Sequence, residues 1–131
     1  MYIGGPMKIE RLLTNICSKD LEKSKLFYTS LFSFNVDYDS DWFVHLISEG
    51  KELELGIILQ DHEIVPDKTT GSITGAYLTF VIDDVDRIYQ KAKNLGVEIL
   101  ESPKETPYGQ KRMLVLAPEG TVCDISSPTN T

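Results

Sequence analysis

Hydrophobic and polar residues follow the same order twice along the chain. The segment "LLTNICSKDLEKSKLFYTSLF" begins at Leu12, and "AYLTFVIDDVDRIYQKAKNLG" begins at Ala76. Each segment is an apolar run, then a short polar turn, then apolar residues at helical spacing. With Asp20 placed over Asp84, an offset of 64 residues, the chemical types match along both segments. A fixed internal period of this kind predicts a chain built from two similar halves.

The first half predicts one helix among four strands. Residues 21–32 form the helix, because their apolar positions recur every three to four residues, and Asp20 or Ser18 caps it. The buried stripe of this helix comprises Leu21, Ser24, Phe27, Tyr28 and Leu31. Residues 10–17 form the first strand, and residues 35–48 form two strands joined by the polar turn 38–41. Residues 50–59 form a turn followed by the fourth strand. The polar segment 60–75 is expected to link the halves.

The second half predicts the same order of elements. Its helix begins at Val85, is capped by Asp83 or Asp84 and ends before Gly96. Its buried face comprises Val85, Ile88, Ala92 and Leu95. The strands are residues 76–82, 97–100, 111–117 and 121–126, with a loop at 101–110 and a turn at 118–120. Each half is therefore expected to be a βαβββ module, and helices on one side of mostly antiparallel strands make an α+β fold. We expect one domain, 1–131, with modules at about 8–60 and 75–128.

Composition narrows the classes of function. The chain has 131 residues, 41% of them hydrophobic and 25% charged, which is typical of a globular protein. Its formal net charge of −7 disfavours nucleic acid and mildly favours neutral or cationic ligands. No apolar run reaches the roughly 20 residues that span a bilayer, so no membrane partner is expected.

The start of the chain and the two cysteines bear on location. "MYIGGPMKIE" lacks the basic start and apolar centre of a signal peptide, and Met7 is a candidate natural start. If Leu13 and Asp124 face the same cavity, strand alternation turns the sulfurs of Cys17 and Cys123 apart, which favours reduced thiols. We therefore expect a cytoplasmic protein.

Three motifs in order carry a resemblance to a known family. They are "DLEKSKLFY" with "LFSF" after the first strand, "VIDDVDRIYQKAKNLGVEI", and "PYGQKRMLVLAPEG" followed by "CDIS". On the internal repeat, from about Leu13 to Ile125, the chain resembles the vicinal oxygen chelate superfamily of glyoxalase I, bleomycin-resistance proteins, fosfomycin-resistance enzymes and extradiol dioxygenases. The resemblance implies two modules whose strands form a curved mixed sheet around a cleft. It also implies a homodimer in which both subunits often line the cleft.

The resemblance also identifies four positions where metal-using members carry ligands. These positions are Leu13, Glu54, Tyr77 and Asp124, so both usual histidines are replaced. Ala117 stands where the family motif usually has Asp. Because two carboxylates fall short of the three protein ligands of a catalytic site, we expect no metal cofactor. The alternative is one divalent ion held by Glu54 and Asp124 with His45 or His62, neither of which is at a family ligand position.

The four positions are expected to converge on a cleft that binds a small organic ligand. Trp42 and Tyr108 lie next to turns and could close over it, although core or dimer packing is an alternative for Trp42. Aromatic rings beside carboxylates favour a flat or cationic ligand. Lys111 and Arg112 are candidates to pair with the two carboxylates, and the alternative is that both are surface residues. The predicted ligand-binding residues are Leu13, Trp42, Glu54, Tyr77, Tyr108 and Asp124.

The leading hypothesis for function is a metal-independent, dimeric small-molecule-binding protein that sequesters its ligand, similar to bleomycin-resistance proteins. The first alternative is a metal-dependent lyase, isomerase or ring-opening dioxygenase of the same superfamily with an altered ligand set. The second is a non-catalytic regulatory or dimerisation module whose cleft is plugged by Leu13, Tyr77 and Trp42. The chain has no nucleophile elbow, phosphate-binding loop or dinucleotide fingerprint that would indicate other chemistry.

Overall fold

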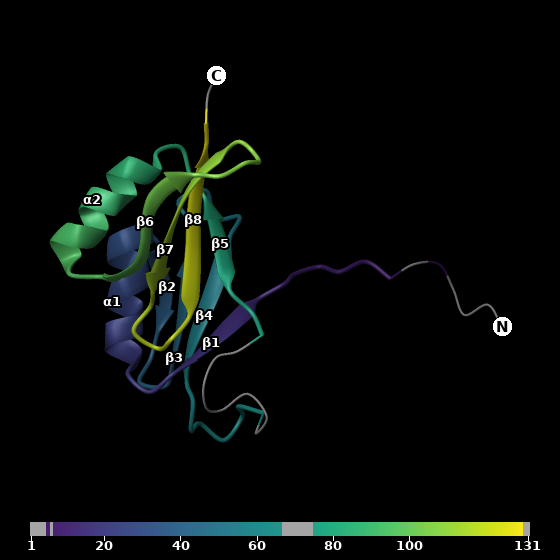
Figure 1. Ribbon diagram of the computed structural model, residues 1–131. Coiled ribbons are helices and arrows are strands. Elements are labelled where there is room, and N and C mark those ends of the chain that lie inside the picture. The colour runs from purple at the N-terminus through teal and green to yellow at the C-terminus, as the bar shows by residue number, and fades with distance from the viewer. Residues whose placement is uncertain (1–4, 6, 67–74, 130–131) are drawn as a thin grey trace.

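A computed structural model describes residues 5, 7–66 and 75–129 of the chain. The described elements form two consecutive βαβββ modules with the two helices on one side of the molecule (Figure 1). The predicted internal repeat and the α+β fold class are therefore confirmed. The expectation that residues 1–131 are one domain stays a prediction, and one apolar core containing residues of both modules supports it.

The first module forms a four-stranded sheet, which we call sheet A. Its strand order is β1-β4-β3-β2, with β1 parallel to β4 and the other pairs antiparallel. Its elements are β1 (Thr14–Ser18), α1 (Leu21–Phe32), β2 (Asn35–Asp39), β3 (Phe43–Ile47) and β4 (Glu54–Leu59).

The second module forms an equivalent sheet, which we call sheet B. Its strand order is β5-β8-β7-β6, and β5 again pairs in parallel with the last strand of its module. Its elements are β5 (Leu78–Val81), α2 (Val85–Leu95), β6 (Glu98–Glu105), β7 (Gln110–Leu116) and β8 (Val122–Pro128). The predicted order of elements is thus confirmed in both halves.

Both helices begin with the same cap and end differently. Asp20 accepts a hydrogen bond from the Lys23 backbone N–H at 3.1 Å, and Asp84 accepts one from Arg87 at 3.2 Å. These two aspartates, rather than Ser18 or Asp83, satisfy orphan donors of the first turns. After α2, Gly96 adopts a left-handed conformation at φ 72°. After α1 the same conformation falls on Ser33, at φ 60°.

The core-facing residues of α1 are buried as the spacing predicts. Val85 and Ala92 of α2 are also buried, and Ile88 packs against the core. Leu95, predicted on the same face, is 49% exposed. It is the last residue of α2, where the chain turns away toward β6, so its side chain covers only the rim of the core.

The longest departure from the predicted elements is β6. Residues 101–105 were expected to be part of a loop because they include a proline, but they extend β6 to Glu105. The strand lies at the edge of sheet B, and its register to β7 shifts between Glu101 and Lys104. An irregular edge strand accommodates Pro103 because no ladder hydrogen bond is needed there.

The two modules are joined through α1 and the turn between β7 and β8. Glu119 in this turn accepts hydrogen bonds from Ser24 Oγ and Tyr28 Oη, both at 2.7 Å, and from Thr121 Oγ1 at 2.6 Å. The rings of Phe32 on α1 and Phe80 on β5 stack with their centroids 3.9 Å apart. Polar and aromatic contacts therefore fix one module against the other.

Two further expectations concern the cysteines and the membrane. Cys17 and Cys123 form no disulfide, and Cys123 is fully buried on the helix-facing side of sheet B. Of the helices in the described part of the chain, neither is long and apolar enough to cross a membrane.

Candidate ligand site on sheet A

Sheet A has one face against the helices and one open face. Residues such as Val44, Leu46 and Ile57 point to the helices and are fully buried. Side chains alternate across a strand, so the residues between them lie on the open face. The contacts confirm this, because a Cβ on Gly56 would clash with Asn15 Oδ1 and lie 3.0 Å from the Phe43 ring. The open face comprises Leu13, Asn15, Cys17, Phe43, His45, Ile47, Glu54, Gly56 and Ile58.

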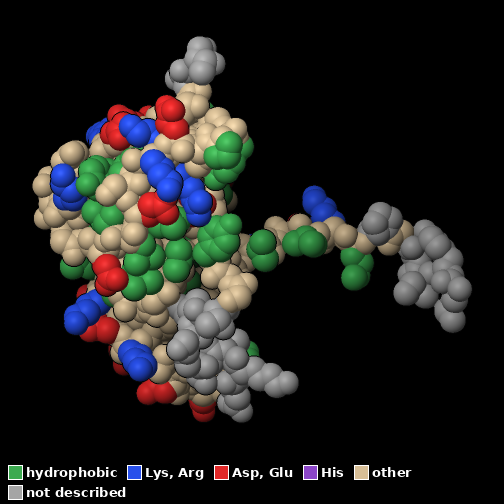
Figure 2. Space-filling model, viewed as in Figure 1, with side chains coloured by type: hydrophobic (Ala, Val, Ile, Leu, Met, Phe, Trp, Pro, Cys, Tyr) green, Lys and Arg blue, Asp and Glu red, His purple; other side chains and the backbone are tan. Residues whose placement is uncertain are grey.

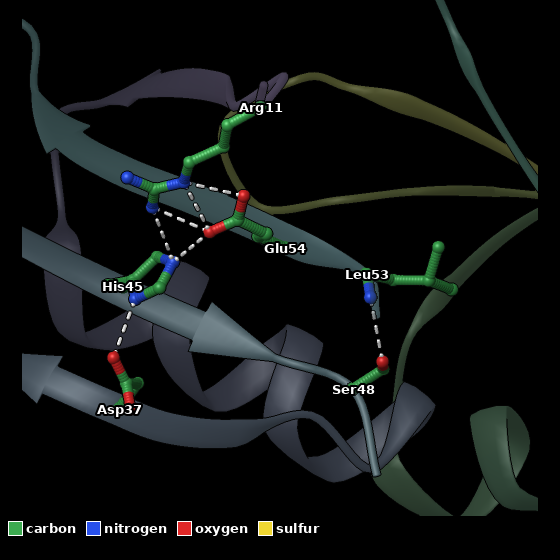
Figure 3. Close-up of polar contacts among 6 residues, drawn as sticks. All are labelled: Arg11, Asp37, His45, Ser48, Leu53 and Glu54. Atoms are coloured by element: carbon green, nitrogen blue, oxygen red, sulfur yellow. Dashed lines mark hydrogen bonds and ion pairs between the residues drawn. The ribbon is translucent and has the colours of Figure 1, made fainter. Parts of the chain in front are cut away.

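Four charged or titratable side chains form a continuous cluster on this face, which we call the Glu54 cluster (Figure 3). Arg11 donates through Nε to Glu54 Oε2 at 2.7 Å and through Nη2 to Oε1 at 2.6 Å. His45 Nε2 lies 2.7 Å from the same Oε1 atom, and its Nδ1 lies 2.9 Å from Asp37 Oδ2. Arg11 Nη2 is also 3.2 Å from His45 Nε2. The chain therefore presents Asp37, His45, Glu54 and Arg11 in one line of contacts.

Local features of three adjacent strands position the cluster. The turn before β4 is closed by reciprocal hydrogen bonds, from the Ser48 N–H to the Leu53 carbonyl and from the Leu53 N–H to Ser48 Oγ. This turn sets Glu54 as the first residue of β4, opposite Ile47 of β3. On β2, the register to β3 shifts between Val36 and Tyr38, so Asp37 is an extra, bulged residue. A bulge redirects a side chain, and here it brings Asp37 to His45.

The electrostatics of the cluster favour an ionised Glu54. The hydrogen bonds from Arg11, followed by those from His45, lower the pKa of Glu54 to about 2. The same contact with Glu54 raises the pKa of Arg11. Both His45 ring nitrogens lie within hydrogen-bond distance of carboxylate oxygens, Nδ1 of Asp37 and Nε2 of Glu54, so the imidazole ring bridges the two acids.

A groove lies beside the cluster, between the start of β4 and the segment that precedes β1. Its volume is about 580 Å³. We call residues 7–12, which lead away from the body of the molecule in Figures 1 and 2, the N-terminal arm. The groove is lined by Ile9, Glu10, Arg11, Leu12, Thr14, Glu52, Leu53 and Glu54. It therefore combines apolar side chains with three carboxylates and one cation.

Sheet B carries a different polar set. Asp124 is 8% exposed and forms an ion pair with Arg112, whose Nε lies 3.3 Å from Oδ1. Thr79 Oγ1 contacts its other oxygen at 3.5 Å. The prediction that Arg112 pairs with a site carboxylate is confirmed, whereas Lys111 instead pairs with Asp86 at 3.0 Å.

The register shows that the two site carboxylates are not equivalent within the repeat. Thr14 pairs with Leu55 in sheet A, and Leu78, its equivalent at the offset of 64, pairs with Cys123 in sheet B. Asp124 is therefore level with Gly56, and Glu54 is level with a valine of β8. Leu13 continues β1 toward Glu54, whereas Tyr77 precedes β5 and is 61% exposed. That the four positions share one cleft stays a prediction.

The two predicted rim residues lie at equivalent turns of the two modules. Trp42 precedes β3, and its ring stacks on His62 with the centroids 4.0 Å apart. His62 was expected to be a solvated loop residue, but this stacking leaves it only partly exposed. Tyr108, between β6 and β7, is 64% exposed. A role for either ring in ligand binding stays a prediction.

The residues present do not fit the divalent metal of the resembled family. The described part of the chain contains no group of three or more His, Cys, Asp or Glu side chains that could hold an ion. Glu54 and Asp124 lie in different sheets and each contacts an arginine. At Glu54 the guanidinium of Arg11 takes up both carboxylate oxygens. The alternative ligand set of Glu54, Asp124 and one histidine therefore has no support in these contacts.

Glu54 was identified from the sequence, but two members of the Glu54 cluster, Arg11 and Asp37, were missed. Arg11 was read only as part of the first strand, and Asp37 was read as an ordinary strand residue. Side-chain alternation along the two neighbouring strands puts His45 and Glu54 on the same face, and this signal could have paired them. The Asp37 contact depends on a bulge, which leaves no mark in the hydrophobic pattern.

The chain matches one family model over most of its length. The model describes the Glyoxalase/Bleomycin resistance protein/Dioxygenase superfamily and matches residues 8–125. No curated protein sequence matches the chain at a significant level.

Solved structures with the same fold share little sequence with the chain. A glyoxalase/bleomycin resistance protein/dioxygenase family enzyme from Burkholderia phytofirmans PsJN is 24% identical, with a TM-score of 0.75 over 88% of this chain and 96% of that one. The fosfomycin resistance protein FosX from Listeria monocytogenes is 18% identical, with a TM-score of 0.73 over 94% and 96%. TioX from Micromonospora sp. ML1 is 14% identical, with a TM-score of 0.73 over 91% and 98%. At these identities the likeness concerns the fold alone.

Proposed function

This chain belongs to the Glyoxalase/Bleomycin resistance protein/Dioxygenase superfamily, and we propose that it binds a small organic molecule on the open face of sheet A without a metal ion. Binding would sequester the molecule, with no chemical turnover. The proposal also includes a homodimer whose second subunit helps to cover the ligand.

One observation carries the metal-independent part of the proposal. Glu54, the best-placed carboxylate for a metal, is held by the guanidinium of Arg11 through two donors at 2.6 and 2.7 Å. Leu13, beside it, has no ligand atom. An internal cation thus supplies the charge that a divalent ion would bring to this carboxylate.

A ligand screen combined with metal titration tests the proposal. Native mass spectrometry of protein purified without chelator is expected to show organic adducts and no stoichiometric metal. Isothermal titration with Zn²⁺, Ni²⁺ and Mn²⁺ is expected to give no binding near one ion per chain. Stoichiometric, tight binding of any of these ions to the wild-type protein would contradict the proposal.

The metal-dependent alternative has one observation in its favour. His45 Nε2 lies next to Glu54, and Asp37 accepts from the other ring nitrogen, as carboxylates do behind metal-bound histidines. However, these groups supply only two direct ligands, and Arg11 would have to leave. A metal-dependent lyase, isomerase or dioxygenase is therefore the second candidate.

A further inference from the structure

The acceptors of the Glu54 cluster and their cationic partner differ in how firmly they are held. Glu54 and His45 lie on paired central strands of sheet A, with side chains only 17% and 13% exposed. Arg11 belongs to the N-terminal arm, and its side chain is 57% exposed. Met7 and Ile9 on the same arm are 94% and 83% exposed. The acceptors are therefore part of a rigid sheet, whereas the arm that brings the cation is weakly attached.

The groove beside the cluster is acidic even with Arg11 in place. Three carboxylates, of Glu10, Glu52 and Glu54, line it against the single positive charge of Arg11. Its apolar walls come from Ile9, Leu12 and Leu53. A molecule that fits this lining has a cationic end and an apolar body, and about 580 Å³ is the volume of a small-ligand pocket.

The geometry of the Arg11 contact identifies the kind of cation. Two nitrogens of one planar group donate to two oxygens of Glu54, and one of them also faces His45 Nε2. A guanidinium or amidinium group reproduces this pattern of parallel donors, whereas an ammonium group or a metal ion does not.

We propose that Arg11 occupies, as an internal substitute, the subsite for a ligand that carries a guanidinium or amidinium group, and that such a ligand displaces Arg11 and places its apolar body in the groove beside Glu54. This inference rests on the proposed function, because it names the ligand class for the same open face. The arm then acts as a competitor that lowers the affinity of the wild-type protein. An exposed ion pair is worth little in water, so a ligand can exchange for Arg11 without unfolding the sheet.

Benzamidine and its neutral isostere benzamide test the proposal by calorimetric titration of the full chain. We compare the wild-type protein with Arg11→Gln, and use Lys8→Gln as the control for the loss of one positive charge from the same arm. Arg11→Gln is expected to bind benzamidine at least about tenfold more tightly, because the competitor is gone. Lys8→Gln is expected to bind like the wild type, and benzamide to gain nothing in any variant.

A second variant and a spectroscopic signal exclude a purely structural effect. In Arg11→Gln/Glu54→Gln the gain in benzamidine affinity is expected to disappear while the circular dichroism spectrum stays native. Benzamidine is also expected to shift the ring resonances of His45 in Arg11→Gln. If Arg11 only stabilised the fold, the second substitution would not change the benzamidine affinity, and benzamidine would not shift the His45 resonances.

Three results would overturn the proposal. These are equal benzamidine affinity in the wild type and Arg11→Gln, an equal gain for benzamide, and a stoichiometric Zn²⁺ site in Arg11→Gln that excludes benzamidine. A screen of neutral and anionic fragments on the wild-type protein distinguishes a wrong ligand class from a wrong proposed function. If those fragments bind and benzamidine does not, only the cationic ligand class is wrong. If no organic compound binds any variant, both proposals fail.

Discussion

At the scale of single residues, Glu54 illustrates how a carboxylate on the open face of a sheet is paired within the protein. Its two oxygens lie within hydrogen-bond distance of Arg11, which precedes β1, and of His45 on β3, and both residues come before Glu54 in the chain. Planar, two-point pairing with arginine fixes the carboxylate more specifically than a point charge would. The charge of Glu54 is thereby compensated within the protein. Because protonation of Glu54 removes this charge, the pair is sensitive to acid.

The stability contributed by Glu54 is expected to vanish in acid. Its pKa in the folded state, about 2, is lower than its ordinary value of 4.5. A depressed folded-state pKa stabilises the protein above about pH 4.5, and this contribution is lost as the pH falls toward about 2. Glu54→Gln is therefore expected to lower the free energy of unfolding at neutral pH and to approach the wild type in acid. Urea unfolding at constant ionic strength, from neutral pH into acid, measures the difference in unfolding free energy between the wild type and Glu54→Gln. A difference that does not change with pH would contradict the prediction.

At the scale of the elements, the hydrophobic pattern predicted more of the fold than of the site. Both helices were located with their bounds because their apolar spacing and aspartate caps are local signals. β6 was underestimated because its edge position, which tolerates Pro103, depends on the assembled sheet. Likewise, the contacts of the Glu54 cluster depend on the pairing of β3 with β4 and on the bulge at Asp37. Local elements can be read from spacing, whereas side-chain pairs between strands cannot.

The ends of the two helices should respond oppositely to substitution. Ser33 holds a left-handed conformation that costs an L-residue free energy, and Gly96 holds the same conformation without this cost. Ser33→Gly is expected to raise the free energy of unfolding by up to about 1 kcal/mol, and Gly96→Ala to lower it by about 1 kcal/mol. Thermal and urea unfolding of both variants check the opposite signs. A change of the same sign in the unfolding free energy of both variants would contradict this, and would show that the backbone at the helix ends adjusts to the substitution.

The connection between α1 and the β7–β8 turn should depend on the charge of Glu119. Its carboxylate accepts from three hydroxyl groups, and burial together with this carboxylate raises the pKa of Tyr28. An amide cannot accept at its nitrogen, so Glu119→Gln removes at least one of these three acceptor contacts. We expect a loss of about 1–3 kcal/mol in unfolding free energy, measured by urea unfolding. The exposed Glu105→Gln is the matched control and should lie within about 0.5 kcal/mol of the wild type.

At the scale of the whole molecule, apolar surface is concentrated where a second subunit could cover it. Hydrophobic side chains follow the N-terminal arm clear of the body (Figure 2), and Met7, Ile9 and Leu12 are each more than 80% exposed. On sheet B, Tyr77 directly precedes the edge strand β5 and is 61% exposed, and Val81 at the end of β5 is 68% exposed. Exposed apolar side chains next to an unpaired strand edge are typical of a surface that pairs with another chain.

The homodimer is expected to form through this surface. Sedimentation of the wild-type protein at micromolar concentration should give about twice the chain mass of 14.8 kDa. Replacing Met7, Ile9 and Leu12 together by serine should shift the protein toward the monomer, since it removes apolar area from the contact. Replacing Leu100 by serine, on the opposite edge strand β6, is the control and should leave the mass unchanged. A monomeric wild-type protein would contradict the expectation.

The parallel pairing that closes each module also bears on the sequence of events in folding. The antiparallel pairs β2–β3 and β3–β4 join strands that are consecutive in sequence. By contrast, α1, β2 and β3 separate β1 from its partner β4 in the sequence. Local pairs close at a lower entropic cost and tend to form first, so β1 is expected to dock late and to bring Arg11 to Glu54 after the rate-limiting step. In stopped-flow measurements Leu46→Ala in β3 should slow refolding, while Arg11→Gln should chiefly accelerate unfolding. We then expect β1 to be the first strand of sheet A to detach, together with the arm that carries Arg11, before the protein unfolds globally.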